Sequence, residues 1–247
     1  MAATPAWPPK STPRLFVEEA LGEGVALRID GPQAHYLLSV MRLKAGDAVK
    51  LCDDRTGEWL GVISATAKRD LVVGVEAQLR PREDVPDLWL AVAPIRKARF
   101  DFVAEKACEL GVARFLPVLM QRCVADKVKP DRLRAQMIEA AEQCGRTALP
   151  EVADVQTLDR FLKGFPAGRT LIFADEEGGA PLADVARTAS CAAILIGPEG
   201  GFADAERAAI LAHPSAVGVS LGPRILRAET AALAAVALPM QPTIPVR

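Results

Sequence analysis

The sequence lacks the patterns of a metal centre or a disulfide framework. It has two histidines, His35 and His213, and five cysteines that lie far apart with no C-x-x-C spacing. Zinc sites need grouped Cys and His ligands, and disulfide scaffolds need dense, paired cysteines. We therefore expect no metal, and thiols that are small buried groups in a reducing compartment. The cysteines are Cys52, Cys108, Cys123, Cys144 and Cys191.

Long apolar runs are also missing. The longest apolar segment, Ala231–Met240, is too short to span a bilayer and contains Pro239. The N-terminal stretch Met1–Lys10 has no apolar core of the kind found in secretory signals. We expect a cytoplasmic protein with no membrane partner.

An excess of one charge sign is absent overall but present locally. The chain has 30 Lys and Arg against 31 Asp and Glu, so no general basicity indicates a nucleic-acid partner. Between Pro94 and Arg134, however, ten basic residues face five acidic ones. This local excess is compatible with a phosphate-bearing partner, although a solvated helix face is the commoner cause. No G-x-G-x-x-G or Walker A pattern occurs, which weakens the case for a nucleotide-dependent enzyme.

The N-terminal third has the pattern of a small β domain. Residues 1–13 are Pro-rich and predict a flexible arm. Apolar residues then alternate with period two, as in Val25–Ile29 and Leu71–Val75. One helical piece covers Pro32–Met41 and is predicted to carry its apolar residues Tyr36, Leu37, Val40 and Met41 on one face. We interpret residues 14–82 as a β-barrel domain that ends in a polar, Pro-bearing linker.

After the linker, apolar runs alternate with helical stretches. Such alternation is typical of an α/β domain with a mostly parallel sheet flanked by helices, here over residues 83–247. The helices predicted most clearly cover Phe100–Gly111 and Asp131–Cys144, each with an apolar stripe at helical spacing. The expected strands are Leu88–Ala93, Phe115–Leu119, Thr170–Ala174, Ala192–Ile196 and Ala216–Val219.

Two glycine-bearing turns follow successive strands of this domain. Leu195–Phe202 leads into a helix for which Asp204 is a candidate N-cap, and Ser220–Ala231 opens another helix. Turns at the carboxyl ends of parallel strands border the ligand sites of α/β proteins, and glycine lets a ligand approach the backbone. The two turns are therefore predicted to border one pocket, the alternative being tight turns without a ligand.

These turns, with four other stretches, resemble the ribosomal RNA small subunit methyltransferase E family, which belongs to the SPOUT class. The likeness runs from about Arg14 to Leu238, and its motifs are specific through their combination and order. The Pro-rich arm departs from the family pattern, as do Cys123 and Cys144, which stand where serine-like residues are expected. The other stretches are Lys97 with Asp101 and Lys106–Val112, Glu139–Arg146, Arg14–Phe16, and His35–Gly46; Glu206 accompanies the first turn.

The resemblance implies a fold and a reaction. The expected fold is a PUA-like RNA-binding β-barrel followed by a SPOUT domain whose chain ends in a trefoil knot. The expected activity is S-adenosylmethionine-dependent methylation of N3 of one uridine in 16S ribosomal RNA, near the decoding site of the small ribosomal subunit. A homodimer is implied as well, with the cofactor pocket near the subunit interface.

The cofactor needs an apolar slot that is rich in backbone groups, and the two turns supply candidates for its walls. The alternative is that Leu221, Ile225 and Leu226 simply belong to the core. The cofactor-binding candidates are Ile196, Gly197, Pro198, Glu199, Gly200, Gly201, Leu221, Gly222, Ile225, Leu226 and Thr230.

Uracil N3 carries a proton at neutral pH, which must be removed, or the resulting anion stabilised. Glu229 and Glu199 are the candidate bases, and Arg227 is a candidate to stabilise negative charge on the base oxygens. The sequence does not decide between the two carboxylates. Arg227 and Glu229 also suit a structural ion pair at the start of the last helix.

The target base must be unpaired or flipped out, and RNA phosphates need cations. We hypothesise that cations of both domains form one track, although each is also compatible with a plain solvated surface. Two other functions stay open: a SPOUT enzyme acting on ribose or another base, and an inactive RNA-binding ribosome-assembly factor. The RNA-binding candidates are Arg14, His35, Arg42, Lys44, Lys97, Arg99, Lys106, Arg122 and Arg146.

Overall fold

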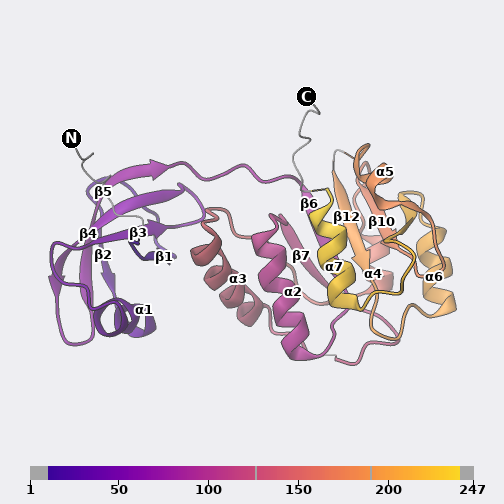
Figure 1. The fold of residues 1–247 in the computed structure, drawn as a ribbon, viewed down its shortest axis with the longest axis horizontal. Helices are drawn as coiled ribbons and strands as arrows, with labels where there is room; N and C mark the ends of the chain where they lie inside the picture. The colour runs from indigo at the N-terminus through magenta and orange to yellow at the C-terminus, as the bar shows by residue number, and fades with distance from the viewer. Residues whose placement is uncertain (1–10, 126, 190, 240–247) are drawn as a thin grey trace. The chain divides into compact units, whose positions relative to one another are not determined.

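The chain forms two compact units in a computed structural model that describes residues 11–125, 127–189 and 191–239 (Figure 1). The first unit holds the chain up to Asp84 together with Ala141–Ala148. The second holds Val85–Ala140 and the chain from Leu149 onward. Most of the arm predicted over residues 1–13 lies outside the described residues.

The first unit is built on a five-stranded sheet with the strand order β1-β3-β4-β5-β2. The pairs are antiparallel, except that β1 runs parallel to β3. The period-two prediction is confirmed, because Leu71, Val73 and Val75 of β5 are all buried in one core. The closed barrel stays a prediction. The strands are β1 (Arg14–Phe16), β2 (Ala26–Ile29), β3 (Ala48–Cys52), β4 (Glu58–Thr66) and β5 (Leu71–Arg80).

The helical piece predicted over Pro32–Met41 is present but changes its winding. It starts as α1 (Gly31–His35) and continues as a π-helix, η1 (Tyr36–Val40). Leu37 is fully buried, whereas Val40 is 61% exposed and Met41 36% exposed. The sequence pattern had placed all three on one apolar face, which is wrong for Val40 and Met41, because the wider π turn does not keep the α-helical spacing.

The second unit contains an eight-stranded sheet in which every pair is parallel, with the order β11-β13-β10-β12-β6-β7-β8 and β9 paired to β7. The predicted α/β class is therefore confirmed. The five predicted strands occur at their expected places. The strands are β6 (Leu88–Val92), β7 (Arg114–Leu119), β8 (Glu151–Val152), β9 (Gln156–Thr157), β10 (Thr170–Ala174), β11 (Ala180–Pro181), β12 (Ala192–Ile196) and β13 (Ala216–Ser220).

Helices accompany this sheet. The predicted apolar stripe of α2 is buried from Phe100 to Ala107, with its last member, Leu110, half-buried. On α6 the N-cap is Ala203 and not Asp204, which is the first helical residue; the Glu206 carboxylate accepts a hydrogen bond from the Ala203 N–H at 3.1 Å. The helices are α2 (Lys97–Glu109), α3 (Pro130–Cys144), α4 (Leu158–Lys163), α5 (Leu182–Ala186), α6 (Asp204–Leu211) and α7 (Ala228–Ala237).

The last helix returns to the middle of the sheet. α7 packs against α2 and against strands β6 and β12, although the strand before it, β13, lies beyond β10. The trefoil knot itself stays a prediction from the resemblance. Within the described ranges, no helix combines the length and the apolar character that crossing a bilayer requires.

The cysteines are all free thiols, but only some are buried. Cys52 and Cys108 are fully buried, and burial raises the pKa of the Cys52 thiol to about 12. Cys144 is exposed, so the expectation of buried thiols is wrong at this position. Cys144 ends α3, after the last buried turn of that helix.

A buried carboxylate organises the turn between β3 and β4. The Asp53 side chain accepts hydrogen bonds from the backbone N–H groups of Leu21 at 2.9 Å, Arg55 at 3.0 Å and Thr56 at 2.7 Å. The Thr56 hydroxyl donates a further bond at 2.9 Å. Burial by itself raises the pKa of Asp53, but the four bonds outweigh it and hold the pKa below its ordinary value.

We predict that Asp53→Asn destabilises the protein by about 2 kcal/mol at pH 7, because bonds to a charged acceptor are replaced by weaker ones. A carboxylate whose folded pKa is lowered stabilises the fold above its unfolded pKa, and this contribution is lost as the pH falls through the folded pKa. Acidification below pH ~4 should therefore destabilise the wild type more than the variant. Urea unfolding between pH 3 and 7 measures both effects.

Asp70→Asn is the matched control, since Asp70 forms an exposed pair with Arg28 at 2.8 Å. Exposed pairs contribute little, so this variant should unfold like the wild type. Equal stability of Asp53→Asn and wild type at pH 7 would contradict the prediction.

Candidate active site

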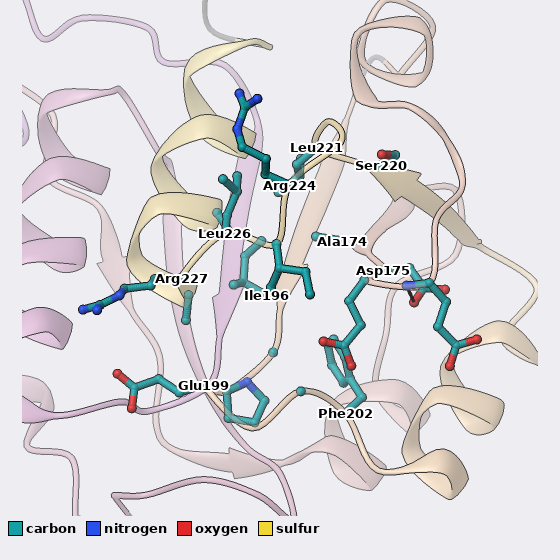
Figure 2. A pocket seen from close by; sticks show the side chains of 18 of the residues that line it. Ala174, Asp175, Ile196, Glu199, Phe202, Ser220, Leu221, Arg224, Leu226 and Arg227 are labelled. Carbon is teal, nitrogen blue, oxygen red and sulfur yellow. Dashed lines mark hydrogen bonds between the residues drawn. The ribbon is translucent and has the colours of Figure 1, made fainter.

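Three loops and the start of α2 enclose one cavity of about 630 Å³ in the second unit (Figure 2). The loops follow β10, β12 and β13, which are neighbours in the sheet. Because these strands are parallel, their carboxyl ends meet at one edge, where α/β proteins bind ligands. The structure thus brings the two glycine-bearing turns of the sequence to a single cavity.

Most of the residues predicted to bind a cofactor line this cavity. Gly200 and Thr230 do not. The Gly200 carbonyl accepts a hydrogen bond from Arg122 Nη1 at 3.0 Å, and Thr230 is exposed on α7. The predicted residues that line it are Ile196, Gly197, Pro198, Glu199, Gly201, Leu221, Gly222, Ile225 and Leu226.

Two glycines of the β12 loop are required by close packing. A Cβ on Gly197 would lie 2.6 Å from the Phe202 ring, which packs edge-on against Phe173. A Cβ on Gly201 would lie 2.5 Å from Glu176 Oε1, and Gly201 has a φ of +70°. Larger residues at these positions would push the loop toward the cavity or away from the sheet.

The apolar side chains of the second turn are not core residues. Leu221 and Leu226 are half-buried, and Ile225 is 88% exposed. Figure 2 shows Ile196 and Leu226 near the centre of the view, between the loops. The alternative in which Leu221, Ile225 and Leu226 fill the core is therefore wrong, and their apolar surface is open to a ligand.

The third loop, Ala174–Gly178, was missed in the sequence analysis. It has the same signal as the other two, a buried strand followed by a glycine-bearing turn, but polar residues dominate it. Its buried Asp175 is held by Arg207 of α6: Arg207 Nε lies 3.1 Å from both carboxylate oxygens, and Nη2 lies 2.7 Å from Oδ2. Arg207 also contacts Glu177 at 3.0 Å.

A charge cluster lies at the cavity edge. Arg99 Nη1 lies 2.6 Å from Glu199 Oε1 and 3.5 Å from Glu229 Oε1. The other oxygen of Glu229, Oε2, is buried and has no hydrogen-bond partner among the described residues. Arg227 forms no ion pair with Glu229 in the described part of the chain. The structural Arg227–Glu229 pair offered by the sequence is therefore not formed there, and Glu229 pairs with Arg99 instead.

The cations predicted to bind RNA fall into two groups. Arg99 is paired with acids, as are Arg14 with Glu58 and Lys106 with Glu105 and Glu109. Arg146 is only 5% exposed. These four are thus engaged within the protein. The exposed candidates are His35, Arg42, Lys44, Lys97 and Arg122.

Comparison with known proteins gives the family. A model described as an RNA methyltransferase domain matches residues 81–240, and one described as an RNA methyltransferase PUA domain matches residues 29–76. The ribosomal RNA small subunit methyltransferase E of Rickettsia conorii is 30% identical over 229 residues, covering 91% of this chain and 93% of that protein. The chain belongs to the ribosomal RNA small subunit methyltransferase E family.

Solved structures agree with this membership. A family member from Neisseria gonorrhoeae, bound to S-adenosylmethionine, is 25% identical with a TM-score of 0.84. A Legionella pneumophila protein described as a methyltransferase in complex with the same cofactor is 28% identical with a TM-score of 0.83. Each comparison covers 92% of this chain and 96% of the other. The resemblance stated from the motifs is confirmed.

We predict that Asp175→Asn loosens the third loop. The buried carboxylate would lose its charge-assisted bonds with Arg207, at a cost of about 2 kcal/mol. Hydrogen exchange of the amides at residues 176–178 should become faster, and urea unfolding should shift to lower concentration. Asp159→Asn, which removes an exposed pair with Lys163, is the control and should change neither measurement. Unchanged exchange in the Asp175 variant would show that this pair does not hold the loop.

Proposed function

We propose that this member of the family methylates N3 of a uridine in 16S ribosomal RNA, with S-adenosylmethionine held in the cavity between the three loops. The observation that carries the proposal is this cavity, formed by the two family-like turns at the edge of a parallel sheet. The similar proteins from N. gonorrhoeae and L. pneumophila were solved with that cofactor.

The cavity fits such a molecule. Its volume of about 630 Å³ lies within the range of small-molecule sites, roughly 300–1,000 Å³. Ile196, Leu221 and Leu226 offer apolar surface for an adenine ring, and the glycine turns offer backbone groups for its edge. Glu176 offers an exposed carboxylate for hydroxyl or ammonium groups. The cofactor supplies an electrophilic methyl group on a positively charged sulfur.

Positioning and proton removal fall to the protein. We assign the base to Glu229, one oxygen of which lies 3.5 Å from Arg99 Nη1, while the other has no hydrogen-bond partner among the described residues. Glu229 does not itself line the cavity, but its neighbours Arg227 and Ala228 do, so it is proposed to take the proton of uracil N3 from the start of α7. Arg227 lines the cavity and is exposed, which suits a cation that stabilises negative charge on the base oxygens. Glu199 is paired more closely with Arg99 and is assigned to positioning.

The rest of the proposal concerns partners and domains. Residues 14–82 are proposed to form the RNA-binding domain and residues 83–247 the methyltransferase domain, with His35, Arg42, Lys44, Lys97 and Arg122 as phosphate contacts. The homodimer, the small ribosomal subunit as substrate and the cytoplasmic location belong to the same proposal and rest on the family resemblance.

We predict that the protein transfers one methyl group to a uridine when incubated with S-adenosylmethionine and small ribosomal subunits that lack this modification. Nuclease digestion and mass spectrometry should locate 3-methyluridine at one position. Glu229→Gln should reduce the rate at least about a hundredfold, the usual size of a general-base contribution, with little change in cofactor affinity. A methyl group on ribose or on another base would overturn the proposed substrate, and cofactor binding without any transfer would favour an assembly factor.

We predict that Gly197→Ala lowers the affinity for S-adenosylmethionine at least about tenfold, because the new methyl group collides with the Phe202 ring and moves the loop into the cavity. Isothermal titration calorimetry measures this. The control is Gly22→Ala, where the nearest atom to the added Cβ is 3.8 Å away. A Gly197 variant that binds the cofactor like wild type would place the cofactor elsewhere.

A further inference from the structure

An exposed apolar pair in the first unit has no role in the site described above. Val40 and Met41 are 61% and 36% exposed; Val40 is the last residue of the π-helix η1 (Tyr36–Val40), which continues α1, and Met41 is its C-cap. We call these two residues the apolar tip. Figure 1 shows the helix that leads to it, α1, at one end of the strands of this unit.

The π turn explains why the tip is outside. The Met41 N–H donates to the Tyr36 carbonyl at 2.9 Å, a bond that skips one residue more than in an α-helix. With this winding, Leu37, Leu38 and Leu43 face the core, and Val40 and Met41 face solvent. π turns occur frequently at functional sites, because they insert a residue that packing alone does not require.

The next residue is held in a strained conformation. Arg42 has a φ of +56°, a region that arginine rarely adopts. Asp54 is the other non-glycine residue with a positive φ in the described ranges, but aspartate tolerates this region well. Strain of this kind persists where the surrounding structure enforces it and clusters at binding and catalytic sites. Here it ends the helix and turns the chain directly after the tip.

Two positive groups follow the tip in the chain. The side chains of Arg42 and Lys44 are exposed, and neither pairs with an acid among the described residues. The Asp47 carboxylate accepts a hydrogen bond from the Lys44 backbone N–H at 2.7 Å and so shapes the loop. An apolar pair beside unpaired cations suits a polyanion that also offers flat apolar faces, which is unpaired RNA.

We propose that Val40 and Met41 pack against the faces of unpaired bases in the RNA substrate, while Arg42 and Lys44 contact the flanking phosphates. The proposal rests on the proposed function in one respect, that the substrate is RNA. It adds a recognition element for unpaired bases that belongs to the first unit, whereas the cofactor cavity belongs to the second. An unpaired target would thereby be selected by binding as well as by the reaction.

The test separates the two kinds of contact by their salt dependence. The probe is naked 16S ribosomal RNA lacking the modification, with filter binding measured over a range of salt concentrations. The double variant Val40→Ser with Met41→Ser should lose about tenfold in affinity, or about 1.4 kcal/mol, at every salt concentration, because no ionic contact is removed. An excess of single-stranded oligouridylate should compete better for the wild type than for this variant.

Arg42→Asn should behave differently. The slope of log affinity against log salt should fall by about 0.7, the value of one phosphate contact on a single strand. The melting temperature should rise by about 2 °C, because asparagine adopts a positive φ more easily than arginine. A gain in stability together with a loss of binding is not expected of a residue with only a structural role.

Leu79→Ser is the control for the tip, since Leu79 is another exposed apolar residue of this unit, at 37%. It should leave RNA affinity unchanged. The proposal is overturned if the tip variant binds like wild type, if its loss depends on salt, if Leu79→Ser loses as much, or if the wild type does not bind this RNA. Methylation mapped to another nucleotide would overturn the proposed function but not this inference, which is read from binding alone.

Discussion

The parallel register of β10, β12 and β13 is the constraint on which the site depends. Parallel neighbours send their chains out at one edge, so three segments far apart in the sequence become the walls of one cavity. The register does not by itself keep the cavity open. An open cavity also requires loops held in place by tight contacts. Gly197 packs against the Phe202 ring in the β12 loop, and Asp175 bonds to Arg207 in the β10 loop.

The strands and the glycine turns could be predicted because each depends on local sequence. A buried parallel strand is a short apolar run, and a turn that meets an aromatic ring needs glycine, so Ala192–Ile196 and Gly197 were recognisable as they stand. The loop after β10 was missed because its walls are polar. Asp175 reads as a surface residue until Arg207, 32 positions away, is placed beside it.

Whether each basic side chain is exposed, buried or paired with an acid could not be predicted, because this depends on residues distant in the chain. Arg99 and Lys97 are both basic and lie two residues apart, yet Arg99 is half-buried between two carboxylates and Lys97 is exposed. Arg146 is buried, and no local sequence pattern predicts this. Likewise, helical periodicity assumes α-helical winding, so it placed Val40 and Met41 on the buried face of what is in fact a π turn.

The Arg99 cluster, formed by Arg99, Glu199 and Glu229, joins an ion pair to the proposed proton transfer. One guanidinium faces two carboxylates, and its closer contact goes to Glu199. The second oxygen of Glu229 is buried and has no hydrogen-bond partner in the described part of the chain. A buried oxygen that stays unsatisfied costs about 1–3 kcal/mol. In the proposed reaction Glu229 receives the proton from its place at the start of α7, and a group in that role must keep an acceptor free. The same pairing explains why Arg99 is not available to a phosphate, since contact with RNA would remove the cation that orients the proposed base.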